Sequence, residues 1–202
     1  MSTINQVFLH AAAFLKVAST YASAADELRL ANTVEDLIAN YARWHWNSTA
    51  GQDIGIALSG QDYSLVAADQ NKVLAIQDAY LTDATFKYPR LVVDGKFALP
   101  VTDDTGRPLA CGLISASAMR FWPAANASYT FKWRYYKRGT VHAANSESWD
   151  VPTSYEGIVK TGMIWQLFEY QDDLRAPQFE KRFYAMLDNL ARQERVSAGR
   201  IT

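Results

Sequence analysis

The sequence contains a single cysteine, Cys111, so no disulfide can form within the 202-residue chain. It has no apolar run close to the roughly 18 residues that a membrane-spanning helix needs. It also has no excess of either charge, because 20 lysines and arginines stand against 21 aspartates and glutamates, a formal net charge of -1 at pH 7. A protein that grips a polyanion such as DNA over its whole surface needs a clear excess of cations, so this balance argues against that class.

The beginning of the chain lacks the features of a secretory leader. Residues 7–18 are apolar, but residues 1–6 carry no positive charge and Lys16 interrupts the apolar stretch. A signal peptide has a cationic start followed by an unbroken apolar core. We therefore interpret this segment as a helix that stays in the protein.

Apolar residues recur at helical spacing in four segments of the chain. The first segment is 4–17, and the second runs to residue 46 with Thr33 placed as its N-cap. Pro152 is placed to open a third helix that is apolar on almost all sides, which predicts a central, buried position. Pro177 begins a fourth helix with one apolar face.

Between residues 53 and 138 the period of the pattern changes to two. Short apolar runs alternate with turn clusters such as 59–62 and 69–71. The strongest run is 129–137, in which four aromatic residues fall on one face: Tyr129, Phe131, Trp133 and Tyr135. This alternation predicts an antiparallel strand with one face toward solvent.

Together these elements predict an α+β fold. The expected architecture is a helical bundle, made from the N-terminal and C-terminal helices, with an inserted antiparallel β-rich domain. The predicted boundaries are 1–50 for the N-terminal helices, 51–150 for the β-rich insertion, and 151–202 for the C-terminal helices and tail.

The sequence contains no motif that indicates catalysis or metal binding. The histidines His10, His45 and His142 are far apart, and none has a partner at metal-binding spacing. Cys111 has no basic neighbour that would activate it, so we interpret it as a small buried residue. Nucleophile elbows and glycine-rich phosphate loops are absent as well. We therefore expect a chain that is not an enzyme and has no catalytic residue, metal or cofactor.

Large aromatic residues are abundant, with 6 Trp, 11 Tyr and 9 Phe. Tryptophan, tyrosine and arginine dominate the energetics of protein interfaces, so we expect some of these residues to face other chains. An alternative hypothesis is a binding module that uses Trp122, Trp133 and Tyr135 as stacking platforms for a carbohydrate or a single-stranded nucleic acid.

The order of these features resembles the head-tail adaptor, or connector, proteins of tailed bacteriophages. The resemblance covers residues 30–195. It rests on a helix ending in tryptophan at 36–46, on the phrase MRFWPAA at 119–125 followed by the strand at 129–138, and on Pro152-Thr153-Ser154-Tyr155 leading into the third helix. The helix before residue 25 departs from the family pattern.

The resemblance implies a structural virion protein at the head-tail interface, present in the host cytoplasm before assembly. Copies would form a ring, typically a dodecamer, between the portal protein and the tail or downstream neck protein. DNA would pass through the lumen without sequence-specific binding, and no membrane would take part.

Two groups of residues are the candidate interfaces of such a ring. We expect portal contacts on the last helix and tail, at Phe179, Arg182, Phe183, Arg192, Arg195 and Arg200. We expect contacts with the downstream protein at a turn of the β-rich insertion, at Asp103, Asp104 and Arg107.

Overall fold

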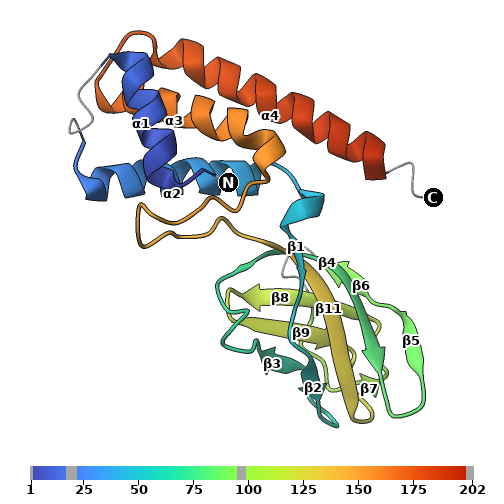
Figure 1. The fold of residues 1–202 in the computed structure, drawn as a ribbon. Helices are drawn as coiled ribbons and strands as arrows, with labels where there is room; N and C mark the ends of the chain where they lie inside the picture. Colours follow the sequence, from blue (N-terminus) through green and yellow to red (C-terminus); the bar gives the residue numbers. More distant parts are fainter. Residues whose placement is uncertain (1, 17–21, 95–98, 199–202) are drawn as a thin grey trace. The chain divides into compact units, whose positions relative to one another are not determined.

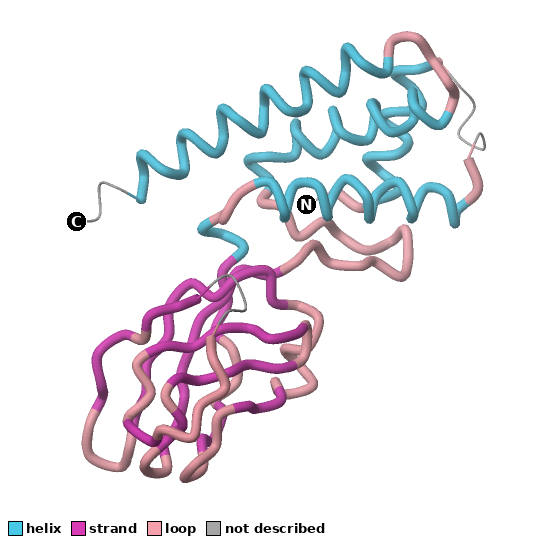
Figure 2. Tube along the Cα trace, turned by 180° about the vertical axis from the view of Figure 1, so that it is seen from behind, coloured by secondary structure: helices cyan, strands magenta, loops and turns pink. Residues whose placement is uncertain are grey.

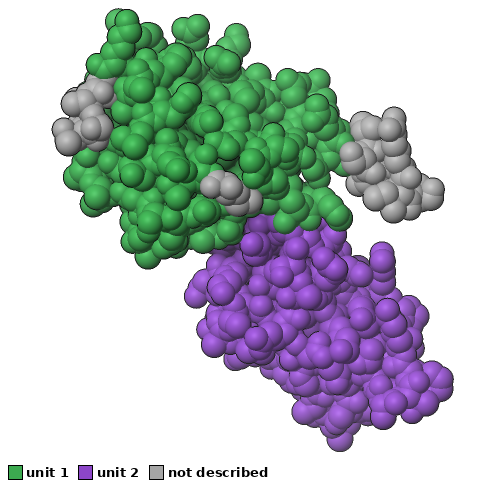
Figure 3. Space-filling view, viewed as in Figure 1, with its two compact units in different colours: residues 1–46, 139–202 green, residues 47–138 purple. Residues whose placement is uncertain are grey.

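The fold was examined in a computed structural model that describes residues 2–16, 22–94 and 99–198 (Figure 1). The protein is α+β and divides into two compact units (Figure 3). The helical unit comprises Met1–Trp46 and Gly139–Thr202, and the β unit comprises Asn47–Arg138. Figure 2 shows that the long helices and the strands segregate between the two units.

The boundary after the β unit lies at residue 138, not at the predicted residue 150. Residues 139–150 belong to the helical unit because their backbone is bonded to the start of the first helix. The amides of Ile4 and Asn5 donate to the carbonyls of Glu147 and Asn145, each at 3.0 Å. The segment is polar and irregular, so the sequence pattern did not separate it from the strands.

The first two helices are α1 (Ile4–Leu15) and α2 (Ala24–Tyr41). α1 begins with a capping box, in which Thr3 and Gln6 satisfy each other's backbone amides. The prediction that Thr33 caps the second helix is wrong. Ser23 is the N-cap, and Thr33 lies inside α2, where its hydroxyl donates to the carbonyl of Arg29 at 2.9 Å.

The third helix, α3 (Glu156–Tyr170), is central, as its apolar pattern predicts. A 3-10 turn at Thr153–Tyr155 leads into it, and it packs against α1, α2 and α4 (Ala176–Ala198). Gly162 permits this close packing, because a Cβ atom there would lie 2.8 Å from side-chain atoms of both Phe183 and Val34.

The β unit contains two main sheets and one small strand pair. The first sheet has the order β1-β11-β4-β5, with β2 also paired to β11, and its strands are β1 (Ser48–Ala50), β2 (Ile54–Ile56), β4 (Val73–Thr82), β5 (Lys87–Arg90) and β11 (Tyr129–Lys137). The second has the order β3-β9-β8-β6, with β3 (Asp62–Ser64), β6 (Val92–Asp94), β8 (Ala110–Ser115) and β9 (Ala118–Trp122). The small pair joins β7 (Thr105–Gly106) to β10 (Ala124–Ala125).

Strand β11 has the predicted bounds, and its four aromatic residues are buried in one core formed by both main sheets. The expectation of a purely antiparallel unit is corrected at two places. β6 pairs with β8 in parallel, and β7 pairs with β10 in parallel. Between β6 and β8 the chain returns to the same end of the sheet, so both strands run in one direction.

Most of the large aromatic residues serve the two cores. Trp44, Trp149 and Trp165 are buried in the helical unit, and Trp133 is buried in the β unit. Because two cores need more aromatic side chains than one, this burial accounts for much of the aromatic surplus, and the expectation that some aromatic residues face other chains stays a prediction. Trp46 is half-buried, and Trp122 has 37% of its surface exposed.

The described helices also bear on membrane insertion. Within the described ranges, none combines the length and the apolar character needed to cross a bilayer.

Candidate interaction surfaces

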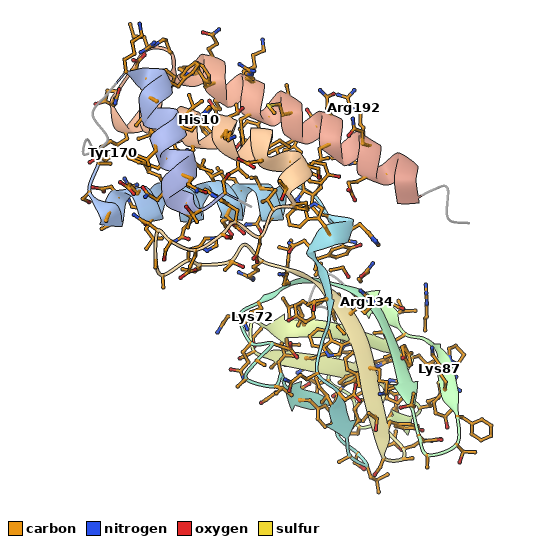
Figure 4. All side chains as sticks on the ribbon, in the orientation of Figure 1. His10, Lys72, Lys87, Arg134, Tyr170 and Arg192 are labelled. Carbon is orange, nitrogen blue, oxygen red and sulfur yellow. The ribbon has the colours of Figure 1, made fainter. Side chains whose placement is uncertain are left out.

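Helix α4 carries a cationic face toward solvent. Lys181, Arg182, Arg192 and Arg195 are all exposed. Among the described residues, no carboxylate lies within ion-pair distance of any of the four. Figure 4 shows Arg192 on the side of α4 that points away from α3. We call these four residues the cationic face.

The carboxylates of α4 are directed toward its neighbours. Asp188 accepts a hydrogen bond of 2.6 Å from the hydroxyl of Tyr41. Glu194 accepts from the Tyr155 hydroxyl at 3.2 Å and from the His45 amide at 3.3 Å. Asp188 is itself exposed and Glu194 is half-buried, so the exposed charged side chains of α4 in the described range are four cations and one carboxylate, which leaves this side of α4 with net positive charge.

A groove of about 300 Å³ adjoins this face, between the start of α3 and the middle of α4. Its walls are mainly apolar and include Tyr155, Gly157, Ile158, Met186, Asn189 and Leu190. A Cβ atom on Gly157 would have only the end of Met186 nearby, at 3.6 Å, so the groove is open at this position. An apolar groove beside unpaired cations fits a protein surface with apolar and acidic groups.

The structure leaves most of the predicted α4 residues accessible and buries one. Arg182, Arg192 and Arg195 are exposed, and Phe179 is half-buried, in edge contact with Phe14 at 5.6 Å between ring centroids. Phe183 is fully buried, so its prediction as an interface residue is wrong. It faces Gly162 and Trp165, because its position on α4 points into the core. Arg200 lies outside the described residues.

The predicted turn of the β unit is exposed at Asp103, Asp104 and Arg107. The amide of Asp104 donates to the hydroxyl of Thr102 at 3.0 Å, which fixes the turn. The guanidinium of Arg107 lies over the ring of Tyr88 in β5, 5.2 Å from its centroid. This contact joins the turn to β5, an association that the sequence did not predict.

Two of the residues named as stacking platforms are not accessible. Trp133 and Tyr135 are each 3% exposed. The indole of Trp133 donates to the carbonyl of Gln52 at 2.9 Å, and the hydroxyl of Tyr135 donates to buried Asp69 at 2.9 Å. Burial, together with this carboxylate, raises the pKa of Tyr135. Both rings therefore belong to the core.

The most unusual polar cluster is buried, and sequence reasoning missed it. His142 Nε2 lies 2.9 Å from Glu35 Oε2, and His142 Nδ1 lies 3.1 Å from Glu147 Oε2. The His142 and Glu35 side chains are only 2% and 3% exposed. Burial lowers the pKa of His142, but the hydrogen bonds to Glu35 and Glu147 outweigh it and raise that pKa above its ordinary value.

This cluster fastens segment 139–150 to α2. The side chain of Asn32 donates to the carbonyl of His142 and accepts from its amide, at 3.2 and 2.8 Å. Glu147 also accepts from the amides of Ala143 and Ala144. Because every polar atom of the imidazole is used by the protein, the cluster is structural, and it leaves no free base for a substrate.

The cysteine and the possible metal ligands were also considered, within the described part of the chain. Cys111 is buried in the β unit, as we inferred, and burial raises its pKa to about 12. A thiol with such a pKa is a poor nucleophile at neutral pH. Among the described residues, no group of histidines, cysteines and acids could hold a metal ion.

Comparisons with known proteins add no relative. No model of a protein family matches the chain, and no curated protein matches it.

Proposed function

We propose that the chain is a head-tail adaptor of a tailed bacteriophage, a structural virion protein that acts by assembly. In this proposal the helices form a bundle into which the β unit is inserted. Copies of the chain form a ring, a dodecamer in the typical case, between the portal protein and the tail or downstream neck protein. DNA crosses the ring through its lumen.

The observation that carries the proposal is the cationic face of α4 beside an apolar groove. Four cations without an ion-pair partner among the described residues and a groove with apolar walls form a surface suited to another protein. The resemblance of residues 30–195 to adaptor proteins supplies the identity of the partner.

We assign the cationic face to the portal. Complementary charge speeds encounter and fixes the register of an interface, and a like charge placed opposite it is strongly unfavourable. The portal surface should therefore present acidic residues around an apolar projection that enters the groove. The β unit is then left for the tail or neck protein.

The test is a charge reversal on α4. The full chain and an Arg182→Glu/Arg192→Glu variant are mixed with purified portal rings, and bound chain is measured by sedimentation and electron microscopy. We expect the variant to bind at least about tenfold more weakly, because repulsion replaces attraction at both positions.

Arg134→Glu is the control, since it reverses an arginine of the β unit that is also exposed. It should bind portal rings like the wild type. The proposal is wrong if wild-type chain does not bind portal rings. The assignment of the cationic face is wrong if the double variant binds as well as the control.

A further inference from the structure

Residues 140–148 form a loop that is attached to the helical unit mainly by hydrogen bonds. The loop lies between β11 and α3 (Figure 1), and His142 is its only buried residue. The residues that fix its far end, Trp149 and Val151, are buried in the helical core. A segment with so few buried contacts can open locally at a lower free energy than the core beside it.

His142 holds the loop on α2 through both its backbone and its ring. Its backbone is bonded to the side chain of Asn32. Its Nε2 faces Glu35 of α2 at 2.9 Å, and its Nδ1 faces Glu147 of the loop itself at 3.1 Å. Among the described residues, these two carboxylates are the ones within ion-pair distance of the ring. Asp150 lies beside Glu35, to which its amide donates at 3.3 Å.

The bonds that the ring makes depend on a single proton. A protonated imidazole donates from both nitrogens, whereas a neutral one leaves a lone pair that faces a carboxylate oxygen. In a buried place such a pair of acceptors is unfavourable, because water cannot supply the missing donor. Burial lowers the pKa of His142, but the two carboxylates outweigh it and raise that pKa above its ordinary value. The proton and the closed loop therefore stabilise each other.

We propose that residues 140–148 are a pH-sensitive strap. While the ring of His142 is protonated, the strap is closed on α2. When the ring loses its proton, the strap opens as a local unit, and the four helices stay folded around their core. Opening brings the neutral ring and Glu35 into contact with water, which supplies the hydrogen bonds that the closed form then lacks.

Opening of the strap changes one of the two connections between the units. The chain passes from the helical unit to the β unit at residues 46–47 and returns at residues 138–139. With the strap closed, the returning chain is bound to the helical unit from its first residues. With the strap open, it is fixed only from Trp149, which is 3% exposed. The proton on His142 therefore controls the length of the free connection after β11.

Hydrogen exchange of the full chain, resolved by NMR and corrected for the intrinsic effect of pH, tests the strap. The amides of His142, Ala143 and Ala144 report its opening, because all three are bonded in the closed form. Met163 of α3 reports the core. The strap amides should have a larger opening constant than Met163. That constant should rise about tenfold per pH unit above the ordinary pKa of histidine, about 6.5, until the pH reaches the pKa of His142 in the folded protein, because one proton is released on opening.

Glu147→Gln should remove the effect of pH while keeping the closed structure. Glu147 Oε1 accepts from the amides of Ala143 and Ala144, and Oε2 is the atom that faces His142. A glutamine keeps the first two bonds and can donate from its amide nitrogen to the unprotonated Nδ1, which leaves the Nε2 hydrogen for Glu35. The strap of this variant should stay closed as the pH rises, with an opening constant that no longer increases.

Glu169→Gln is the matched control, because it removes an exposed carboxylate of α3 by the same chemical change. It should keep the wild-type dependence on pH. Three results would overturn the inference: a wild-type opening constant that does not change with pH, strap amides that exchange only together with Met163, or a Glu147→Gln variant that responds to pH like the wild type. No portal protein takes part in these measurements, so their outcome is separate from the test of the proposed function.

Discussion

His142 is buried between two carboxylates, of which Glu35 is also buried and Glu147 is 40% exposed. A neutral imidazole has one N–H and cannot donate to both Glu35 and Glu147, whereas a protonated imidazole donates to each. The two carboxylates raise the pKa of His142 above its ordinary value despite burial, which favours the protonated ring. The positive ring also compensates the buried charge of Glu35, whose own pKa is raised by burial.

Replacing His142 should therefore destabilise the helical unit. We expect His142→Gln to lower the free energy of unfolding by about 3 kcal/mol at pH 7, because removing one partner of a buried ion pair leaves the other uncompensated. Urea denaturation measures the change. His10→Gln is the control, since His10 is exposed on α1, and it should have little effect.

The same residue predicts how stability depends on pH. A histidine whose pKa is raised on folding contributes its full stability below its ordinary pKa, and this contribution is lost as the pH rises through the folded value. Wild-type protein should therefore lose stability as the pH rises above the ordinary pKa of histidine, and His142→Gln should lack that component. Parallel pH profiles for the two proteins would contradict the protonated state of His142.

This cluster could not be predicted from the sequence. Glu35 and His142 are separated by 107 residues, and neither has a neighbour in the sequence that marks it. Glu27 and Glu35 also explain why the start of α2 was predicted wrongly. Both acids are buried, and they interrupt the apolar stripe that would have indicated the first turns of the helix. In a sequence, a buried charged residue cannot be distinguished from an exposed one unless its partner is known.

Among the elements, α3 depends most on a single small residue. Gly162 lets α3 approach α4 and α2 closely. Alanine is ordinarily the better helix residue, but a methyl group here would overlap Phe183 and Val34. We expect Gly162→Ala to destabilise the protein by about 1–3 kcal/mol, the usual cost of overpacking a core.

For Gly157→Ala, on the same helix, we expect the opposite change in stability. Its Cβ would meet only the end of Met186, so it should stabilise the protein by up to about 1 kcal/mol through helix propensity. Thermal denaturation of both variants makes the comparison. Equal effects of the two substitutions would mean that propensity, and not packing, determines the result.

The elements differed in how well the sequence predicted them. β11 was predicted to its ends because its aromatic residues alternate without interruption. α1, α3 and α4 were found because their apolar spacing is regular. Three residues of the cationic face, Arg182, Arg192 and Arg195, were named from the sequence, whereas Lys181 was not.

At the scale of the whole molecule, the first and last residues of the β unit lie next to each other. Ser48 of β1 pairs with Tyr136 of β11, and the side chain of Asn47 donates to the carbonyl of Lys137 at 2.7 Å. The two ends of the unit are thus bonded to each other inside the unit. Such an insertion can be removed with little strain on the unit that receives it.

We expect residues 47–138 to fold when expressed alone, and the remaining helical segments to fold when a short Gly-Ser linker replaces these residues. Circular dichroism spectra typical of strands or helices, and dispersed amide signals in NMR spectra, would show that each part is folded. A helical unit that stays unfolded after the replacement would mean that its core needs the β unit.

The interrupted helical unit also affects how the protein folds during translation. The ribosome releases α1 and α2 first, yet the helix on which both pack ends only at Tyr170. At common elongation rates this leaves the two early helices without their partner for roughly ten seconds. The β unit, whose residues are contiguous, can finish folding within that interval. In the nascent chain, the apolar faces of α1 and α2 are therefore exposed to solvent until the last quarter of the chain emerges.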